Sequence, residues 1–234
     1  MVFTLDLANI CAKVIPMAVK QKEIVVHSRT PDTRGPERYQ SVESEMRKLI
    51  YSMMVSLDGF IAGPNRELDW HIVDEELHTY INGQQSAIGA YLYGRRMYEN
   101  MADYWPTADT DPSIPGYILE FARIWKKMPK IVFSKTLEGV EGNATLVREV
   151  SAKEVRELKQ QPGKDLAVGG AGLATTFMRL GLIDEYGLFV HPVILGRGTP
   201  LFPVPANTVN LRLIEARTFG SGVVYLRYQR ADEE

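Results

Sequence analysis

Cysteine is almost absent from this chain of 234 residues. Cys11 is the only one, so the chain cannot form an internal disulfide or a zinc site with several cysteine ligands. The four histidines, His27, His71, His78 and His191, lack the spacing of metal ligands, and we expect no bound metal. Because a chain without disulfides suits a reducing compartment, we expect a cytoplasmic protein.

Long apolar runs and a strong net charge are also missing. No run approaches the roughly 18 apolar residues of a membrane helix, and the opening segment lacks the basic start and the cleavage site of a signal peptide. The formal net charge of −2 gives no general attraction to nucleic acid or to an acidic membrane surface. The Gly-x-Ser-x-Gly motif of many serine hydrolases is absent too. We therefore expect a small-molecule partner, and neither nucleic acid nor a membrane.

The composition changes abruptly near residue 46. The stretch 27–45, "HSRTPDTRGPERYQSVESE", is polar and rich in proline and charge, which is typical of a linker. An apolar run that favours a buried strand begins at Met46. These patterns predict an N-terminal extension over 1–45, flexible or arm-like or translated from an upstream start codon, and one folded domain over 46–234. The alternative is that residues 1–25 add a strand or a helix to the core.

Strand and helix patterns alternate through the folded domain. The expected strands cover 48–56, 87–94, 130–134, 144–149, 165–170, 184–196, 209–218 and 223–230, and the expected helices cover 74–83, 95–101, 114–128, 151–160 and 173–181. Ser151 with Glu154 forms a capping-box pattern, and Gly181 is a C-terminal cap after the stripe Leu173, Phe177 and Leu180. The alternation predicts an α/β fold with a mostly parallel mixed sheet, helices on both faces and a C-terminal antiparallel hairpin.

Glycines gather at one junction between a strand and a helix. Gly169 and Gly170 end an apolar strand, and Gly172 starts the next helix. Ligands of open α/β sheets bind at the carboxyl ends of strands, and a helix N-terminus with bare backbone suits a phosphate. The alternative is a tight turn with close packing of helix on strand.

Two further strand ends carry phosphate-binding chemistry. The residues are Gly94, Arg95 and Arg96 at one end, and Ser134, Lys135 and Thr136 at the other. Two cations at a helix start oppose the helix dipole, which makes sense if an anion lies between them. The alternative is a pair of solvated arginines. Together with the glycine junction, these make three strand ends suited to phosphate, which predicts one extended ligand with several phosphates. Arginines instead of an acid at the ribose favour NADPH over NADH.

The motifs "SLDGFIAG", "YGRRMYE", "FSKTLEG", "VGGAGL" and "LIDEYGLFVHPVILGRGTPLF", followed by the closing hairpin, resemble the dihydrofolate reductase-like superfamily. The resemblance is greatest to the reductase domain at the C-terminus of the bacterial riboflavin-biosynthesis deaminase–reductase and to its stand-alone relatives. It extends from Met46 to about Arg230. It implies a single domain with an eight-stranded sheet, NADPH as hydride donor and a homodimer. The His-x-Glu and Pro-Cys-x-x-Cys motifs of a zinc deaminase are missing, so the chain is not expected to deaminate.

The resemblance also implies roles for the cofactor-binding residues. Gly94, Arg95 and Arg96 would meet the 2′-phosphate side of the dinucleotide, Ser134 and Lys135 would flank the adenosine ribose, and Gly169, Gly170, Ala171 and Gly172 would cradle the pyrophosphate.

On the substrate side, the resemblance implies that Ser56 and Asp58 border the nicotinamide and the substrate, together with a mobile loop that reaches Trp70. Asp58 is the candidate catalytic residue, and the alternative is an Asp-Gly turn. Asp74 or Glu75 is the candidate acid on the first helix. The alternative for these two is a charged first turn that suits the helix dipole.

The expected reaction is hydride transfer from NADPH to a pterin-like or aminopyrimidine-like substrate, similar to 5-amino-6-(5-phosphoribosylamino)uracil reductase. A reductase acting on dihydrofolate or another small molecule is an alternative. A nucleotide-binding protein without turnover is another. His191, beside Pro192, is predicted to be a satisfied histidine at a strand end instead of a catalyst.

Overall fold

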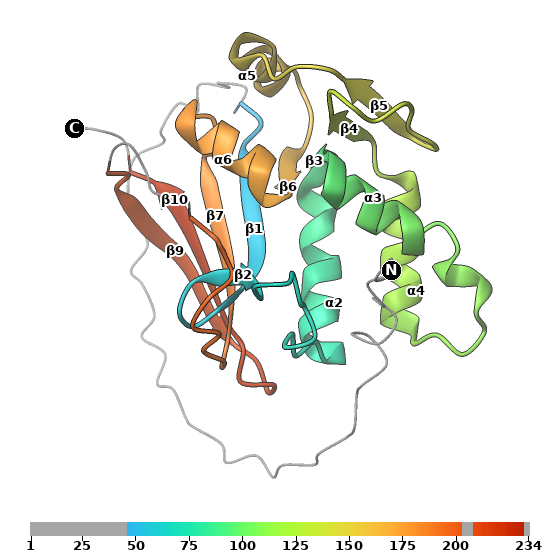
Figure 1. Cartoon of the computed structure of the whole chain (residues 1–234), viewed down its shortest axis with the longest axis vertical. Helices are drawn as coiled ribbons and strands as arrows, with labels where there is room; N and C mark the ends of the chain where they lie inside the picture. The colour runs from blue at the N-terminus through green and yellow to red at the C-terminus, as the bar shows by residue number, and fades with distance from the viewer. Residues whose placement is uncertain (1–45, 203–207, 232–234) are drawn as a thin grey trace, which may run out of the picture.

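A computed structural model describes residues 46–202 and 208–231 of the chain (Figure 1). The predicted extension 1–45 and the alternative that residues 1–25 join the core lie outside the described residues. The strands are β1 (Leu49–Ser56), β2 (Phe60–Ala62), β3 (Ile88–Gly94), β4 (Lys130–Phe133), β5 (Ala144–Val147), β6 (Asp165–Gly169), β7 (Glu185–His191), β8 (Thr199–Pro200), β9 (Leu211–Thr218) and β10 (Val224–Arg230). The α-helices are α2 (Glu75–Gln84), α3 (Arg95–Tyr104), α4 (Gly116–Lys127), α5 (Ala152–Gln160) and α6 (Ala171–Arg179), and two 3-10 turns cover Gln85–Ala87 and Ala108–Thr110.

Eight of the described strands form one sheet in the order β5-β4-β3-β6-β1-β7-β10-β9. The first six strands of this order are parallel, and β10 is antiparallel to both β7 and β9. Figure 1 shows β9 and β10 at one side of the sheet and β4 and β5 at the other. The predicted fold class, including the C-terminal antiparallel hairpin, is confirmed. The parallel strands all end at one edge, which we call the carboxyl edge.

Helices cover both faces of the sheet. Leu166 and Val168 of β6 pack into a cluster with Leu173 and Phe177 of α6. Residues of β3 that point to the opposite face pack with α3 and α4, and a smaller cluster joins α2 to β7 and β10. Burial on both faces explains why the parallel strands are continuous apolar runs.

The predicted helix caps are present. The Ser151 hydroxyl accepts the Glu154 N–H at 3.3 Å. Gly181 has a φ of +63°, and the N–H of Leu182 bonds to the carbonyl of Phe177 at 2.9 Å, as in a Schellman motif. The predicted stripe is wrong at its last member, because Leu180 is 36% exposed and follows the end of the helix.

Several predicted boundaries shift for physical reasons. The strand predicted over 184–196 ends at His191, since Pro192 has no N–H for the ladder. Gly83 lies inside α2 and does not end it. Helix α6 begins at Ala171, two residues before its predicted start. The short antiparallel pair β2–β8 was not predicted, because two or three residues are too few to show an alternating pattern.

Candidate functional site

The ends of β3 and β6 lie side by side at the carboxyl edge, with Tyr93 paired to Gly169. A Cβ on Gly169 would lie 2.8 Å from ring carbons of Tyr93 and 3.0 Å from Cγ of Met97. Gly170 has a φ of +98°, and a Cβ there would lie 3.2 Å from Cβ of Met97. Close packing and backbone conformation therefore explain the first two glycines of the junction, as the alternative interpretation holds.

Gly172 is different from its two predecessors. It lies in the first turn of α6, and a Cβ built on it would meet nothing within 4 Å. The first N–H groups of a helix have no acceptor within that helix. Open space next to bare N–H groups suits a phosphate, so the start of α6 fits the pyrophosphate that the sequence predicts there.

The ends of β3 and β4 are also joined. Gly94 is the N-cap of α3 and pairs with Phe133. Arg95 donates from Nη1 to Oγ1 of Thr136 at 2.7 Å and from Nε to Glu99 at 2.7 Å. Arg96 is exposed and has no ion-pair partner among the described residues. One of the two predicted arginines is thus held in place, and the other has an uncompensated charge.

The turn after β4 combines a structural serine with exposed cations. The Ser134 hydroxyl is buried and accepts the N–H groups of Thr136 and Leu137 at 3.2 and 3.0 Å. Ser134 thus shapes the turn. The Lys135 side chain is 77% exposed, and its Nζ lies 3.8 Å from Glu149, which is a weak pair.

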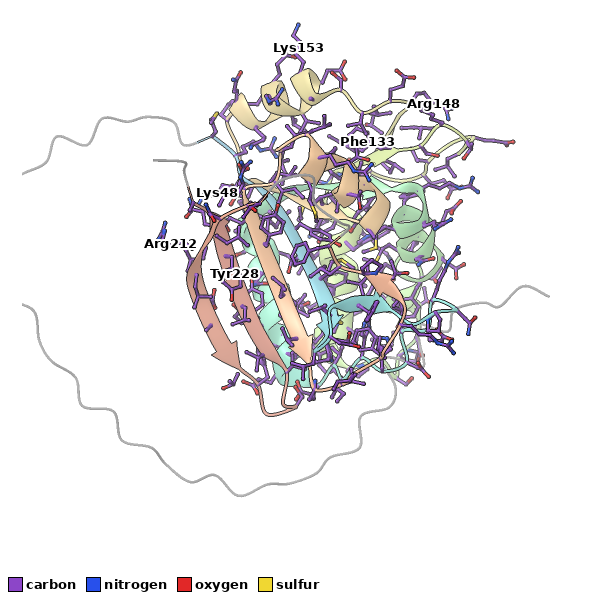
Figure 2. The ribbon with its side chains drawn as sticks, turned by 60° about the vertical axis from the view of Figure 1, so that its left-hand side comes forward. Lys48, Phe133, Arg148, Lys153, Arg212 and Tyr228 are labelled. Carbon is purple, nitrogen blue, oxygen red and sulfur yellow. The ribbon has the colours of Figure 1, made fainter. Side chains whose placement is uncertain are left out.

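Arg148 is a cation of this edge that sequence reasoning missed. It follows β5 and donates from Nη1 to the carbonyls of Ser134 and Leu137 at 3.3 and 2.5 Å. Figure 2 labels Arg148 together with Phe133 of β4, the neighbouring strand. The strand predicted over 144–149 included Arg148, whereas β5 ends at Val147, and the available signal was a cation near the end of a predicted strand.

The predicted cofactor-binding residues therefore meet in space. A Cβ on Gly170 would lie 3.8 Å from the backbone N of Gly94, and the Arg95–Thr136 bond joins the next strand end. Three chain crossings with phosphate-binding chemistry form one continuous stretch of the carboxyl edge.

A second group lies at the ends of β1 and β7, where Ser56 pairs with His191. The Ser56 hydroxyl donates to Oδ1 of Asp58 at 2.6 Å, and the carboxylate also accepts the N–H groups of Leu195 and Gly196 at 3.1 and 2.7 Å. The hydrogen bond from Ser56, followed by those from the two backbone N–H groups, lowers the pKa of Asp58. Asp58 is therefore an ionised anchor between two loops at neutral pH.

This arrangement includes the Asp-Gly turn that the sequence offered as an alternative. Gly59 has a φ of +89°, and its N–H bonds to the carbonyl of Ser56 at 2.9 Å. A catalytic role for Asp58 stays a prediction. A lowered pKa favours positioning over proton donation.

Trp70 and two histidines cover the end of β7. The Trp70 indole donates to the carbonyl of Glu67 at 3.1 Å, and its ring meets those of His71 and His191 edge-on, with centroids 4.2 and 5.5 Å apart. Nδ1 of His191 accepts the Ile72 N–H at 3.2 Å. Burial lowers the pKa of His191 to about 4 and that of His71 to about 3. Both imidazoles are thus neutral at physiological pH.

The prediction of a satisfied histidine at position 191 is correct for Nδ1 only. Nε2 of His191 and Nε2 of His71 are both buried without a hydrogen-bond partner among the described residues. The sequence shows no pattern that brings these two histidines together, since 119 positions separate the Ile72 donor from His191.

The two acids at the start of α2 differ in their contacts. Asp74 is the N-cap, and its Oδ1 accepts the Leu77 N–H at 2.9 Å, which fits the alternative of a helix-start acid. Glu75 is exposed and has no hydrogen bond or ion pair with other described residues. A substrate contact by Glu75 stays a prediction.

Within residues 46–202 and 208–231, no three His, Cys, Asp or Glu side chains gather as metal ligands do. Every helix in these ranges is too short or too polar to cross a membrane.

The mostly parallel eight-stranded sheet with its antiparallel C-terminal strands is a dihydrofolate reductase-like α/β fold. The dihydrofolate reductase of Enterococcus faecalis, in complex with NADP(H), superposes with a TM-score of 0.53 at 14% identity, over 79% of this chain and 97% of that chain. The sequence profile of the RibD C-terminal domain matches residues 47–225, and the chain belongs to this family.

One sequence relative and one further solved structure are similar to the chain. It is 38% identical to the uncharacterized protein YyaP of Bacillus subtilis over 187 residues, which are 79% of this chain and 95% of YyaP. The Thermotoga maritima diaminohydroxyphosphoribosylaminopyrimidine deaminase/5-amino-6-(5-phosphoribosylamino)uracil reductase superposes with a TM-score of 0.56 at 15% identity. That match covers 81% of this chain and 58% of the Thermotoga chain.

Proposed function

We propose that the protein is an NADPH-dependent reductase. The observation that carries the proposal is the meeting of the three strand ends, in which Gly94 approaches Gly170 and Arg95 bonds to Thr136. A single dinucleotide laid along this edge would meet the open start of α6 with its pyrophosphate and the exposed cations Arg96 and Lys135 with its 2′-phosphate. The family and the NADP(H) in the Enterococcus enzyme support the same cofactor.

The chain's own residues divide the work of binding. Arginine binds phosphate through charge-assisted hydrogen bonds, so Arg95 and Arg96 select a cofactor with a 2′-phosphate. When bound, the reduced nicotinamide supplies the hydride. Ser56, Asp58 and the loop bonded to them form the wall at the nicotinamide end. Trp70 supplies an apolar surface, and loop 59–68 excludes water when it closes over the site.

The substrate we propose is a pterin-like or aminopyrimidine-like heterocycle. The Thermotoga protein is a 5-amino-6-(5-phosphoribosylamino)uracil reductase, whose substrate is an aminopyrimidine. The missing deaminase motifs exclude the other half of that activity from the proposal. The hydride goes to a C=N or C=O carbon, and the neighbouring nitrogen or oxygen takes its proton from water or from an acid.

The test has two stages. A thermal-shift titration compares NADPH with NADH, and we expect NADPH to stabilise the protein at lower concentration. Oxidation of NADPH is then followed with 5-amino-6-(5-phosphoribosylamino)uracil or dihydrofolate as substrate, which separates the two reductase alternatives. A protein that binds NADPH tightly and oxidises it with neither substrate would be a nucleotide-binding protein. Absence of NADPH binding would contradict the whole proposal.

We also propose that the protein is a homodimer, with strand β9 at the interface. Among the described strands β9 pairs with β10 alone, and Figure 2 shows Arg212 of β9 and Tyr228 of β10 at this edge. Leu211, Leu213 and Ile214 on β9 are all exposed. Monomers rarely leave an apolar edge strand open to solvent, which favours a second copy of the chain as its cover.

The dimer proposal makes a direct prediction. Leu213→Glu places a charge on the exposed apolar edge and is expected to convert the dimer to a monomer, measured by light scattering after gel filtration. Lys153→Glu, on the exposed surface of α5 and outside β9, is the control. A wild-type protein that elutes as a monomer would contradict the proposal.

A further inference from the structure

Two buried imidazole nitrogens at the end of β7 have unused hydrogen-bonding capacity. Nε2 of His191 and Nε2 of His71 lack a partner among the described residues, and His191 is 0% exposed. Buried polar atoms are nearly always paired. An unpaired one next to a predicted binding site therefore points to a ligand.

The proton of His191 can be assigned to one nitrogen. Because Nδ1 accepts the N–H of Ile72 at 3.2 Å, Nδ1 carries no proton in the neutral ring, and Nε2 must carry it. The free atom is thus an N–H donor. The ring of His71 lies beside it with a centroid separation of 5.3 Å and a tilt of 34°.

The other polar groups at the ends of β1 and β7 are already engaged. The Ser56 hydroxyl donates to Asp58 and accepts from the Phe60 N–H at 2.9 Å. Asp58 accepts three hydrogen bonds, two of them from the loop after β7. Of these neighbours, the imidazoles are the ones that have a buried polar atom without a partner among the described residues.

We propose that the Nε2–H of His191, with His71 beside it, positions the substrate by donating a hydrogen bond to a ring carbonyl of a lactam-type heterocycle. This inference rests on the proposed function and adds a positioning residue to it. A neutral donor suits the carbonyl of an uncharged ring, and a site built to bond a polar atom discriminates strongly against a ring that lacks it.

A ligand reaches this nitrogen only if the segment above it moves. Trp70 and His71 pack edge-on and tilted against His191, and the Ile72–His191 bond holds the same segment. We therefore expect ligand binding to alter the amide resonances of this segment as well as the histidine.

The first test is on the wild-type protein saturated with NADP⁺. Long-range ¹H–¹⁵N spectra of histidine are recorded during titration with 5-aminouracil, which has ring carbonyls, or with 2,4-diaminopyrimidine, in which amino groups replace them. The expected result is an Nε2-protonated neutral His191 whose Nε2 resonance moves with 5-aminouracil and not with the diamine. An Nδ1-protonated His191, or a resonance that 5-aminouracil leaves unmoved, would overturn the inference.

The second test uses variants and calorimetry. His191→Leu removes the donor and is expected to weaken 5-aminouracil binding by about tenfold, while His191→Gln retains an N–H donor and recovers part of the affinity. His78→Leu is the matched control, because His78 is also buried with an unpartnered nitrogen but packs against Tyr117 and Phe121 elsewhere.

The outcomes separate the inference from the function on which it rests. NADPH affinity is expected to stay unchanged in His191→Leu, since the cofactor phosphates bind at the other strand ends. Equal losses for NADPH and 5-aminouracil would indicate a structural role and overturn the inference. A wild-type protein that binds NADPH but not 5-aminouracil would overturn the inference alone, whereas one that binds no NADPH would overturn the proposed function.

Discussion

The two halves of the carboxyl edge differ in what they leave unbonded. At the ends of β3, β4 and β6, the free groups are charges and backbone N–H groups, with Arg96 and Lys135 exposed and Gly172 open to solvent. At the ends of β1 and β7, the buried Ser56 and the exposed Asp58 are bonded to each other and to neighbouring backbone N–H groups, and two buried neutral imidazole nitrogens remain. The first half suits a phosphorylated chain, and the second suits an uncharged ring.

One edge of the sheet can therefore bind two ligand parts that differ in how much of their hydration they lose. Phosphates keep part of their hydration and are bound by exposed cations, so affinity there depends on salt. A heterocycle transferred into a buried site must be matched by neutral donors and acceptors, because an unpaired buried group costs free energy. Substitutions at one half of the edge should therefore leave the other half unaffected.

The largest expected effect is on stability in acid, through the β1–β7 half. The pKa of His191 is about 4 in the folded protein because of burial, against about 6.5 when unfolded. The unfolded chain therefore binds the proton first as the pH falls. The contribution of His191 to the free energy of unfolding should fall by about 3 kcal/mol between about pH 6.5 and pH 4 and change little below.

Urea unfolding at several pH values measures this effect, with His191→Gln as the comparison. The variant should lose less stability than the wild type over the same pH range, although carboxylates contribute to both curves. Parallel curves for the two proteins would show that His191 is not buried as a neutral group.

The next effect concerns the β3–β6 half. Gly169→Ala places a methyl 2.8 Å from the Tyr93 ring and should lower the free energy of unfolding by about 1–3 kcal/mol. Gly172→Ala has free space and should raise it by up to about 1 kcal/mol, since alanine favours a helix. NADPH affinity should fall in Gly172→Ala despite the gain in stability. An unchanged affinity would remove the pyrophosphate from this position.

The remaining effect is on binding alone and distinguishes the two arginines by cofactor. Arg96→Ala removes an unpaired cation and should weaken NADPH binding by about tenfold or more, because hydrogen bonds to charged groups contribute about 1.5–3 kcal/mol. NADH binding should hardly change. Arg95→Ala should also weaken NADPH more than NADH, but it breaks the bond to Thr136 as well. Calorimetry measures the affinities of both variants for NADPH and NADH, with Arg212→Ala as the surface control. Equal losses of affinity for the two cofactors would rule out the 2′-phosphate assignment.

The fold was predictable because its signals are local. Buried parallel strands are apolar runs, and the caps at Ser151 and Gly181 satisfy backbone groups within a few residues. The meeting of the strand ends followed from topology, since parallel strands end at one edge. The pair β2–β8 was too short to leave a pattern.

The site was predictable only where the residues at a single strand end already indicate phosphate binding. Arg95 and Gly170 stand out in the sequence. The pairing of His71 with His191 does not, because it depends on how a loop folds back over the end of β7. The sequence also does not show why glycine stands at each position of the junction. At Gly169 the ring of Tyr93 leaves no room for a side chain, whereas at Gly172 there is free space.

The central claim is that one dinucleotide bridges three strand ends. The most direct measurement is an NADPH titration followed through the backbone amide resonances of Arg96, Thr136 and Gly172 in ¹⁵N-labelled protein. The claim predicts that all three resonances shift together and fit a single dissociation constant. With NADH in place of NADPH, the resonance of Gly172 should shift as before, and those of Arg96 and Thr136 should shift less. Movement at one strand end alone, or three different dissociation constants, would contradict it.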